Sequence, residues 1–131
     1  MSDQLLHVEV VSADRVVWSG EATRVIARTT EGDVGILPDH APILSLMVHG
    51  VVDVLTDEGE TWVAAVSDGF LSVAGNRVSI LAEFAEASHD IDLEKARADL
   101  ERAKAAGEHS DQAIEVVRLA EARIRAAEQA R

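Results

Sequence analysis

The chain has 131 residues and a formal net charge of −12; 47% of its residues are hydrophobic and none is cysteine. That length and apolar content suit one ordinary domain, or one small domain with an appendage, while the lack of cysteine excludes disulfides and thiolate metal sites. The acidic balance argues against sequence-independent binding to nucleic acid or to anionic lipid, because both need a cationic surface.

The composition of the chain changes near Ala87. Residues 1–87 contain all four aromatic residues and carry 14 acidic against 4 basic residues, a net charge of −10. Residues 88–131 contain 11 alanines and carry 10 acidic against 8 basic residues, a net charge of −2. We therefore expect two domains, 1–87 and 88–131. The apolar runs in both are far shorter than the roughly 18 residues of a membrane span, so no direct lipid insertion is expected.

The first domain reads as a series of short strands. Apolar residues recur at every second position from Leu6 to Val10, as in a half-buried strand. Further strands are expected over 25–29, 43–48, 51–55, 61–66, 70–73 and 77–81. Turn residues separate them, among them Gly59 and the pair Gly75-Asn76. Short strands at a spacing of about 8–12 residues, with no helical segment between them, predict an all-β sandwich of about ten short antiparallel strands.

Residues 30–44 form the most constrained stretch of this domain. They include two glycines, two prolines and an apolar pair: Gly32, Gly35, Pro38, Pro42, Ile36 and Leu37. We expect an irregular loop. Exposed apolar residues in a loop stiffened by proline make a good binding surface, because little entropy remains to be lost on docking. The alternative is that the apolar pair folds back on the core, and the residues alone leave both open.

The second domain reads as two helices. Leu93, Ala96, Leu100 and Ala103 lie on one stripe of the first helix, with Asp90 or Asp92 as its cap and Gly107 as its stop. The second helix has Ser110 or Asp111 as its cap and this stripe: Ala113, Val117, Ala120, Ile124 and Ala127, with Ile114 beside it. A short turn makes the pair a C-terminal antiparallel αα-hairpin. Because alanine buries little apolar surface, we expect the hairpin to dock weakly on the sandwich or to open toward another partner.

No catalytic or metal-binding arrangement is evident in the sequence. The five histidines are His7, His40, His49, His89 and His109. None lies at a ligand spacing such as His-x-x-x-His, and no carboxylate cluster accompanies them. Gly32 and Gly35 lack the Gly-Lys-Ser/Thr of a phosphate-binding loop and read as a tight turn. We therefore expect a chain that is not an enzyme and that holds no metal and no cofactor.

Residues 29–42 resemble the Gly-x-x-Gly-Ile-x-Pro-x-His-x-Pro hallmark of the epsilon subunit of bacterial F-type ATP synthases (proton-translocating ATPases). Residues 68–73, 76–82 and 85–86 resemble later strand motifs of that family in the same order and spacing, and residues 91–96 resemble the start of its C-terminal hairpin. The resemblance covers essentially the whole chain. It implies an N-terminal β-sandwich followed by a C-terminal αα-hairpin, in agreement with the expectation from the residues.

The resemblance also implies a function. The chain would be a non-catalytic rotor subunit of the central stalk, coupling rotation of the c-ring to ATP synthesis, at the cytoplasmic face of the bacterial plasma membrane. The sandwich would bind the gamma subunit and the polar loops of the c-ring. The residues that match the hallmark or lie within it are Asp33, Gly35, Ile36, Leu37, Pro38, His40 and Pro42. Many family members have glutamate at the position of Asp33, whose carboxylate reaches less far.

In the family, the hairpin is the regulatory part. Folded on the sandwich it is permissive, and extended beside gamma into the alpha/beta catalytic head it restrains ATP hydrolysis. Arg118, Arg123, Arg125 and Arg131 make the end of the second helix cationic, so they would complement acidic loops of the head. The alternative is a solvated helix face with pairs such as Glu121 with Arg125.

Some family members bind ATP through an Ile/Leu-Asp-x-x-Arg-Ala motif. Ile91, Asp92 and Ala96 match it, Lys95 replaces its arginine, and Arg102 is suitably placed to help. Lysine cannot make the planar bidentate contacts of a guanidinium group. We therefore predict that ATP, as a regulatory ligand, binds weakly or not at all. Without the resemblance, the main alternative is a stand-alone β-sandwich binding module with a helical oligomerisation tail.

Overall fold

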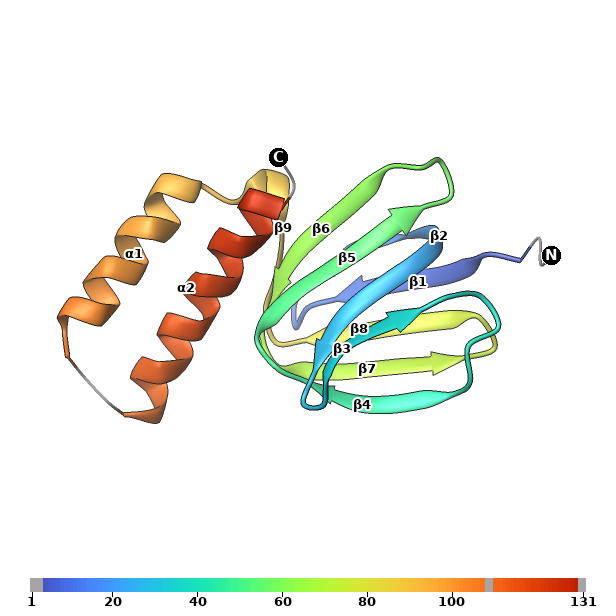
Figure 1. Cartoon of the computed structure of the whole chain (residues 1–131), viewed down its shortest axis with the longest axis horizontal. Coiled ribbons are helices and arrows are strands. Elements are labelled where there is room, and N and C mark those ends of the chain that lie inside the picture. Colours follow the sequence, from blue (N-terminus) through green and yellow to red (C-terminus); the bar gives the residue numbers. More distant parts are fainter. Residues whose placement is uncertain (1–3, 108–109, 130–131) are drawn as a thin grey trace.

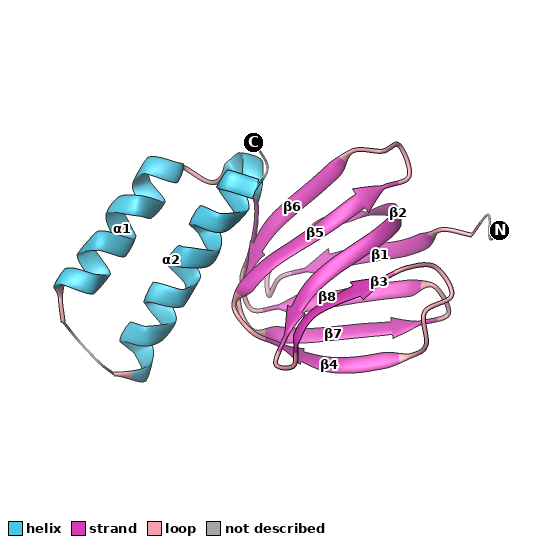
Figure 2. Ribbon diagram, viewed as in Figure 1, coloured by secondary structure: helices cyan, strands magenta, loops and turns pink. Residues whose placement is uncertain are grey.

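The computed structural model describes residues 4–107 and 110–129. Figures 1 and 2 show a β-sandwich beside a pair of antiparallel helices. The described strands are β1 (Leu6–Val11), β2 (Val16–Thr29), β3 (Gly32–Ile36), β4 (Ile43–Met47), β5 (Gly50–Thr56), β6 (Thr61–Val66), β7 (Gly69–Ala74), β8 (Arg77–Ala82) and β9 (Ala85–Ala87). A 3₁₀ turn, η1 (Ser88–Asp90), leads to α1 (Leu93–Ala105) and α2 (Asp111–Gln129). The predicted fold class is confirmed.

Strand β2 belongs to both layers of the sandwich because it is long enough to bend from one to the other. Its first half pairs with β1, in a layer that continues through β8 and β7 to β4. Its second half pairs with β3 and β5, in a layer that continues through β6 to β9. β1 and β8 run parallel, so the expectation of antiparallel strands is wrong for that one pair.

Two segments differ from the expected strand pattern. β2 begins at Val16, nine residues before the expected strand 25–29. The sequence did not predict this first part of the strand because Ser19, Gly20 and Glu21 interrupt the alternation of apolar residues. β3 lies inside the expected irregular loop, where it pairs with β2 from Thr29 opposite Gly32 onward. Two glycines in five residues conceal this strand, since its pairing comes from the partner strand and not from β propensity.

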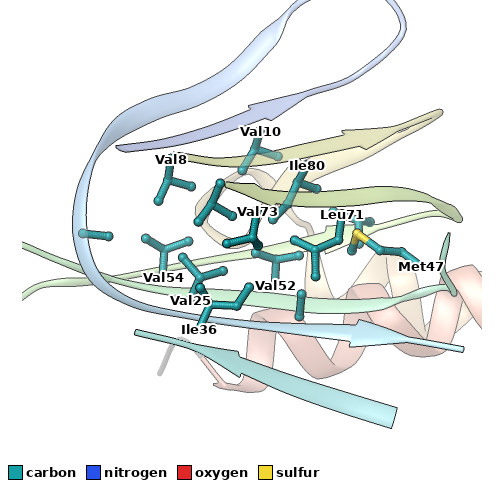
Figure 3. Close-up of a cluster of buried hydrophobic side chains, with 14 of the residues drawn as sticks. Val8, Val10, Val25, Ile36, Met47, Val52, Val54, Leu71, Val73 and Ile80 are labelled. Atoms are coloured by element: carbon teal, nitrogen blue, oxygen red, sulfur yellow. The ribbon is translucent and has the colours of Figure 1, made fainter. Parts of the chain in front are cut away.

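The core fills the space between the two layers, as Figure 3 shows. Its largest fully buried side chains include Leu6, Ile36, Met47, Leu71 and Ile80, which come from β1, β3, β4, β7 and β8. Valines of β1, β2, β5 and β7 pack among them: Val8, Val10, Val25, Val52, Val54 and Val73. These alternating inward-facing residues explain why the short strands close into a sandwich.

The hairpin lies against the outer face of β5 and β6 (Figure 1). Ala122 and Ala126 of α2 are fully buried in a cluster with Val63 and Ala65 of β6. These two alanines lie outside the predicted stripe because α2 packs against both α1 and the sandwich. Neither described helix is long and apolar enough to cross a membrane.

The predicted ends of the helices are confirmed. Asp92 caps α1 by accepting a hydrogen bond from the Lys95 backbone N–H at 3.1 Å. Gly107, with φ of +66°, follows the end of α1. The Ser110 hydroxyl accepts a hydrogen bond from the Ala113 backbone N–H at 3.2 Å, which starts α2.

Candidate partner-binding surface

An uncovered row of apolar side chains crosses the outer face of the layer that contains β4, β7, β8 and β1. The strand register places neighbouring members opposite one another in the order Leu46, Phe70, Leu81, Val11 and Val16. Four of the five, all except Val11, are 51–55% exposed. We call these five residues the apolar row. A row spanning five strands is too continuous for scattered surface residues, so it indicates a contact surface.

The surroundings of the apolar row make it a larger patch. Leu44, two residues before Leu46 on the same face of β4, is 76% exposed. A groove of about 660 Å³ is lined by Leu46, Phe70 and Leu81 and also by two acidic residues, Asp68 and Glu83. The corresponding outer face of the other layer is already covered by α2. Within residues 4–107 and 110–129, the patch is therefore an apolar sheet face that neither helix covers.

Gly69 allows β7 and β8 to approach closely beside the apolar row. A Cβ atom at this position would lie 1.9 Å from the carbonyl oxygen of Leu81. Any other residue would push the backbone of β8 away and disturb the register that aligns Phe70 with Leu81.

The sequence interpretation missed the apolar row, although a signal was present. Phe70-Leu71 and Ile80-Leu81 are apolar pairs in strands that otherwise alternate. In each pair one residue enters the core and the other faces outward. An apolar residue on both faces of neighbouring strands indicates a sheet that is covered on both sides.

In the loop that follows β3, each of the two alternatives holds for one residue of the apolar pair. Ile36 is fully buried in the core, whereas Leu37 is 57% exposed. Pro38 and His40 are half-buried and Pro42 is exposed. Leu37 thus remains available to a partner, in a loop that leads directly into β4 and its exposed Leu44.

Asp33 lies on the other layer, away from the apolar row. It stands opposite Arg28 of β2, and the Arg28 Nε donates a hydrogen bond to the Asp33 carboxylate at 3.0 Å. This bond lowers the pKa of Asp33, and the same pair raises the pKa of Arg28. A lowered carboxyl pKa stabilises the fold above the unfolded value near 4, and the contribution is lost as the pH falls through the folded pKa. Both side chains are about half exposed, so the contribution is small.

The structure therefore does not bring all the hallmark residues together. Asp33 lines a small groove of about 170 Å³ with Arg28, Arg125 and Gln129, beside the C-terminal end of α2. Gly35 is exposed on the same strand as Asp33. Leu37 and the residues that follow lie in the connection between the two layers. Two surfaces, not one, contain residues of the hallmark.

An ion-pair cluster joins the hairpin to the sandwich. The Arg123 side chain of α2 donates a hydrogen bond to Glu86 of β9 at 2.8 Å and lies 3.7 Å from Asp99 of α1. Arg123 is 17% exposed and Glu86 is 21% exposed. Nearer the end of α2, Gln129 donates a hydrogen bond to Asp53 of β5 at 2.8 Å. The docked hairpin is thus held by polar contacts as well as by alanine packing.

The other candidate arginines are placed differently. Arg118 and Arg125 are exposed on α2, and Arg125 lies near enough to Asp33 to lower its pKa further. Arg131 lies outside the described residues. In this conformation Arg123 is committed to Glu86 and Asp99, so only its two exposed neighbours on α2 are accessible to a partner.

The candidate nucleotide-binding residues do not share one pocket. Asp92 is occupied as the cap of α1, Lys95 is exposed, and Arg102 forms an ion pair with Asp99 at 2.8 Å. Arg102 lines a groove of about 480 Å³ between the two helices, but Asp92 and Lys95 do not line it. Within residues 4–107 and 110–129, no group of three or more histidine or acidic side chains is arranged to hold a metal ion. His109 lies outside these ranges.

A family model and individual relatives of known sequence indicate the same family for this chain. Residues 5–88 match the family model described as ATP synthase, Delta/Epsilon chain, beta-sandwich domain. The ATP synthase epsilon chain of Streptomyces avermitilis is 54% identical over 114 residues, covering 87% of this chain and 92% of that protein. The ATP synthase epsilon chain of Rhodococcus jostii is 47% identical over 126 residues, covering 95% of this chain and 98% of that protein.

Comparison with solved structures supports the fold. A chain of the Euglena gracilis mitochondrial ATP synthase, in a structure of OSCP, F1 and c-ring, matches with a TM-score of 0.82 and 23% identity, covering 98% of this chain and 86% of that chain. A chain of the Tetrahymena thermophila mitochondrial ATP synthase, from its central stalk and c-ring, matches with a TM-score of 0.60 and 15% identity, covering 99% of this chain and 98% of that chain. Taken with the sequence relatives, these results show that the chain belongs to the ATP synthase epsilon-chain family.

Proposed function

We propose that this chain is a non-catalytic rotor subunit in the central stalk of an F-type ATP synthase, where it couples rotation of the c-ring to ATP synthesis. Membership of the epsilon-chain family supports this role. The observation that carries it is the apolar row, which leaves one face of the sandwich without a partner. A stalk subunit needs such a permanent contact surface, because it must transmit torque without detaching.

The apolar row is the surface proposed to bind the gamma subunit. It is a continuous apolar patch on rigid strands, the kind of surface that obligate interfaces bury. The exposed Leu37 and Leu44 extend the patch toward the loop after β3. Binding there leaves α2 untouched on the opposite layer, so assembly with gamma and movement of the hairpin can occur independently.

The hallmark residues divide between two proposed contacts. Leu37, Pro38, His40 and Pro42 extend the gamma-binding surface, and Ile36 supports their loop from the core. Asp33 and Gly35, on the exposed side of β3, meet polar loops of the c-ring. Asp33 already pairs with Arg28, so the ring contact requires a donor that shares this carboxylate or replaces Arg28.

The division of charge supports attachment through protein contacts. The sandwich region has a net charge of −10, which disfavours direct binding to anionic lipid. The proposed location is therefore peripheral, at the cytoplasmic face of the bacterial plasma membrane, held by gamma and the c-ring. Catalysis belongs to the alpha/beta head, and this chain acts on it through gamma and through the hairpin.

The hairpin, residues 88–131, is proposed to be the regulatory domain, and residues 1–87 the stalk-binding domain. Docked on β5 and β6, the hairpin is permissive; extended toward the alpha/beta head, it restrains ATP hydrolysis. Alanine packing and a few polar contacts hold the docked form, so a difference of a few kcal/mol suffices to move it. Arg118, Arg123 and Arg125 are then free to meet acidic loops of the head.

Removing the hairpin tests the proposed function. A complex reconstituted with residues 1–87 is expected to retain this subunit and to hydrolyse ATP faster than the complex with the full chain. Retention is expected because the apolar row and its loop are all within residues 1–87. The measurement is the ATP hydrolysis rate together with the subunit stoichiometry. Loss of the truncated chain from the complex would contradict the assignment of the stalk contact to the sandwich, and an unchanged rate would contradict inhibition by the hairpin.

Nucleotide binding to the isolated chain is expected to be weak or absent. Asp92 and Arg102 are engaged in a helix cap and an ion pair, and Lys95 offers only a point charge. Titration calorimetry with ATP should therefore give no saturable heat in the micromolar range. A micromolar affinity that is lost in Asp92→Ala, but kept in the control Lys104→Ala on the same helix, would overturn this expectation.

A further inference from the structure

The loop after β3 contains a tight turn with an unusual residue type at its third position. The His40 backbone N–H donates a hydrogen bond to the Leu37 carbonyl at 3.2 Å, with Pro38 second and Asp39 third in the turn. Asp39 has φ of +68°. A proline followed by a residue of positive φ is the pattern of a type II turn, whose third position normally holds glycine. Aspartate adopts this conformation more readily than most residues with a side chain but less readily than glycine, so contacts from outside the turn stabilise it.

The side chain of Asn76 supplies that support. Its Oδ1 accepts a hydrogen bond from the Asp39 backbone N–H at 2.6 Å, and its Nδ2 donates one to the Asp39 carboxylate at 3.3 Å. The same Nδ2 donates to the side-chain oxygen of Gln4, and the Asn76 carbonyl accepts from the His7 N–H at 2.8 Å. One residue therefore connects Gln4, the start of β1 and the loop after β3.

The position of Asn76 is itself set by the turn between β7 and β8. Gly75 and Asn76 have φ of +57° and +62°, so both residues of this two-residue connection are left-handed, as in a type I′ turn. Asparagine tolerates that conformation better than most residues with a side chain. A glycine at position 76 would satisfy the same turn, yet it would leave Asp39 without either hydrogen bond.

We propose that Asn76 is a positioning residue for partner binding: its side chain holds Asp39 in the left-handed conformation and thereby presents Leu37 and His40 in a preformed loop. The identity of the partner, gamma, rests on the proposed function. A loop that is ordered before binding loses less entropy on docking, which raises affinity without any new contact. Asn76 lies at the opposite end of β7 from Phe70, so it acts through the loop and not through the apolar row.

Two substitutions test the side-chain hydrogen bonds of Asn76 without changing the backbone conformation of either turn. Asn76→Gly keeps the positive φ and removes the hydrogen bonds to Asp39 together with the one to Gln4, and this last loss is the same in every background of Asp39. Asp39→Gly removes the need for those bonds, because glycine adopts the left-handed conformation unaided. If Asn76 acts through Asp39, replacing Asn76 must lower the affinity for gamma in the natural chain, and it must leave the affinity unchanged in the Asp39→Gly chain.

The test is a double-mutant cycle with two readouts. For binding to purified gamma, Asn76→Gly is expected to raise Kd about tenfold, or about 1.4 kcal/mol, while Asp39→Gly and the double variant both stay close to the natural chain. For the His40 backbone amide, hydrogen exchange is expected to accelerate about tenfold in Asn76→Gly and to return to the natural rate in the double variant.

The outcomes distinguish this inference from the proposed function. An equal loss of affinity from Asn76→Gly in both backgrounds, or an unchanged exchange rate at His40, would overturn the role of Asn76. Failure of the natural chain to bind gamma would instead overturn the proposed partner, and the exchange rates at His40 would still decide whether Asn76 holds the loop.

Discussion

Replacing Phe70 with glutamate is expected to weaken binding of the chain to gamma by about 100-fold or more. Phe70 lies inside the apolar row, with Leu46 on one side and Leu81 on the other. A carboxylate at this position would have to lose its water inside an apolar interface without a partner, which is among the costliest changes an interface can undergo. The measurement is titration calorimetry or co-elution of the purified variant with purified gamma.

The isolated variant should remain folded, because Phe70 is half exposed and its outward side chain is not part of the core. The free energy of unfolding is expected to change by about 1 kcal/mol, the size of a few lost cross-strand contacts. Ile114→Glu is the matched control, since Ile114 is an exposed apolar residue on α2, outside the apolar row. Equal weakening by both variants would mean that added charge alone disturbs binding. Unweakened binding by Phe70→Glu would remove the apolar row from the interface.

Replacing Arg123 with alanine is expected to release the hairpin from the sandwich. The change removes the hydrogen bond to Glu86 and leaves this carboxylate, which is only 21% exposed, without its cation. Loss of one partner from a largely buried ion pair costs about 2–3 kcal/mol after allowance for partial exposure, or roughly a 30- to 150-fold fall in the ratio of docked to released hairpin. Hydrogen exchange at Ala122 and Ala126, which are buried against β6, follows that ratio, because an isolated helix as short as α2 is only marginally stable in water once it leaves the sandwich.

Two further variants make this prediction specific. Arg118→Ala removes an exposed arginine from the same helix and is expected to leave the exchange rates unchanged. Arg123→Met combined with Glu86→Leu removes both charges, and docking should return because no carboxylate is left unpaired. In the assembled complex, Glu86→Leu alone should slow ATP hydrolysis, since it breaks the same ion pair, releases the hairpin and leaves Arg123 available to the head. Unchanged exchange in Arg123→Ala would show that alanine packing alone holds the hairpin.

The order of the elements could be predicted from the sequence because it depends on local patterns. Apolar residues at every second position predict β1, and the pair Gly75-Asn76 predicts the turn between β7 and β8. Gly107 and Asp92 mark the ends of α1. Each of these signals acts within a few residues, so a single sequence contains all of it.

The features that were missed depend on partners distant in the sequence. β3 is a strand because β2 pairs with it, and the parallel pairing of β1 with β8 brings together residues about 70 positions apart. The apolar row becomes visible only when the register aligns Leu46, Phe70 and Leu81 from three strands. The ion pair between Arg123 and Glu86 likewise joins α2 to β9, 37 positions apart in the sequence, and no local pattern predicts it.

The candidate site was predicted in part. The stretch 30–44 does contain an exposed apolar residue beside stiffening prolines, as expected for a binding loop. Leu37 fills that role, whereas Ile36 next to it belongs to the core. Asp33 and Leu37 are four residues apart in the sequence but lie on different surfaces, because Asp33 belongs to β3 and Leu37 follows the end of that strand, in the connection to the other layer. Proximity in a motif therefore did not translate into one shared site.

The most direct test of the proposed rotor role is the stoichiometry of this chain with gamma. The purified natural chain mixed with purified gamma should form a stable one-to-one complex in multi-angle light scattering, and the same complex should form when residues 88–131 are removed. A complex that needs the hairpin, or a chain that stays unbound at micromolar concentrations of both proteins, would contradict a rotor subunit anchored through the sandwich.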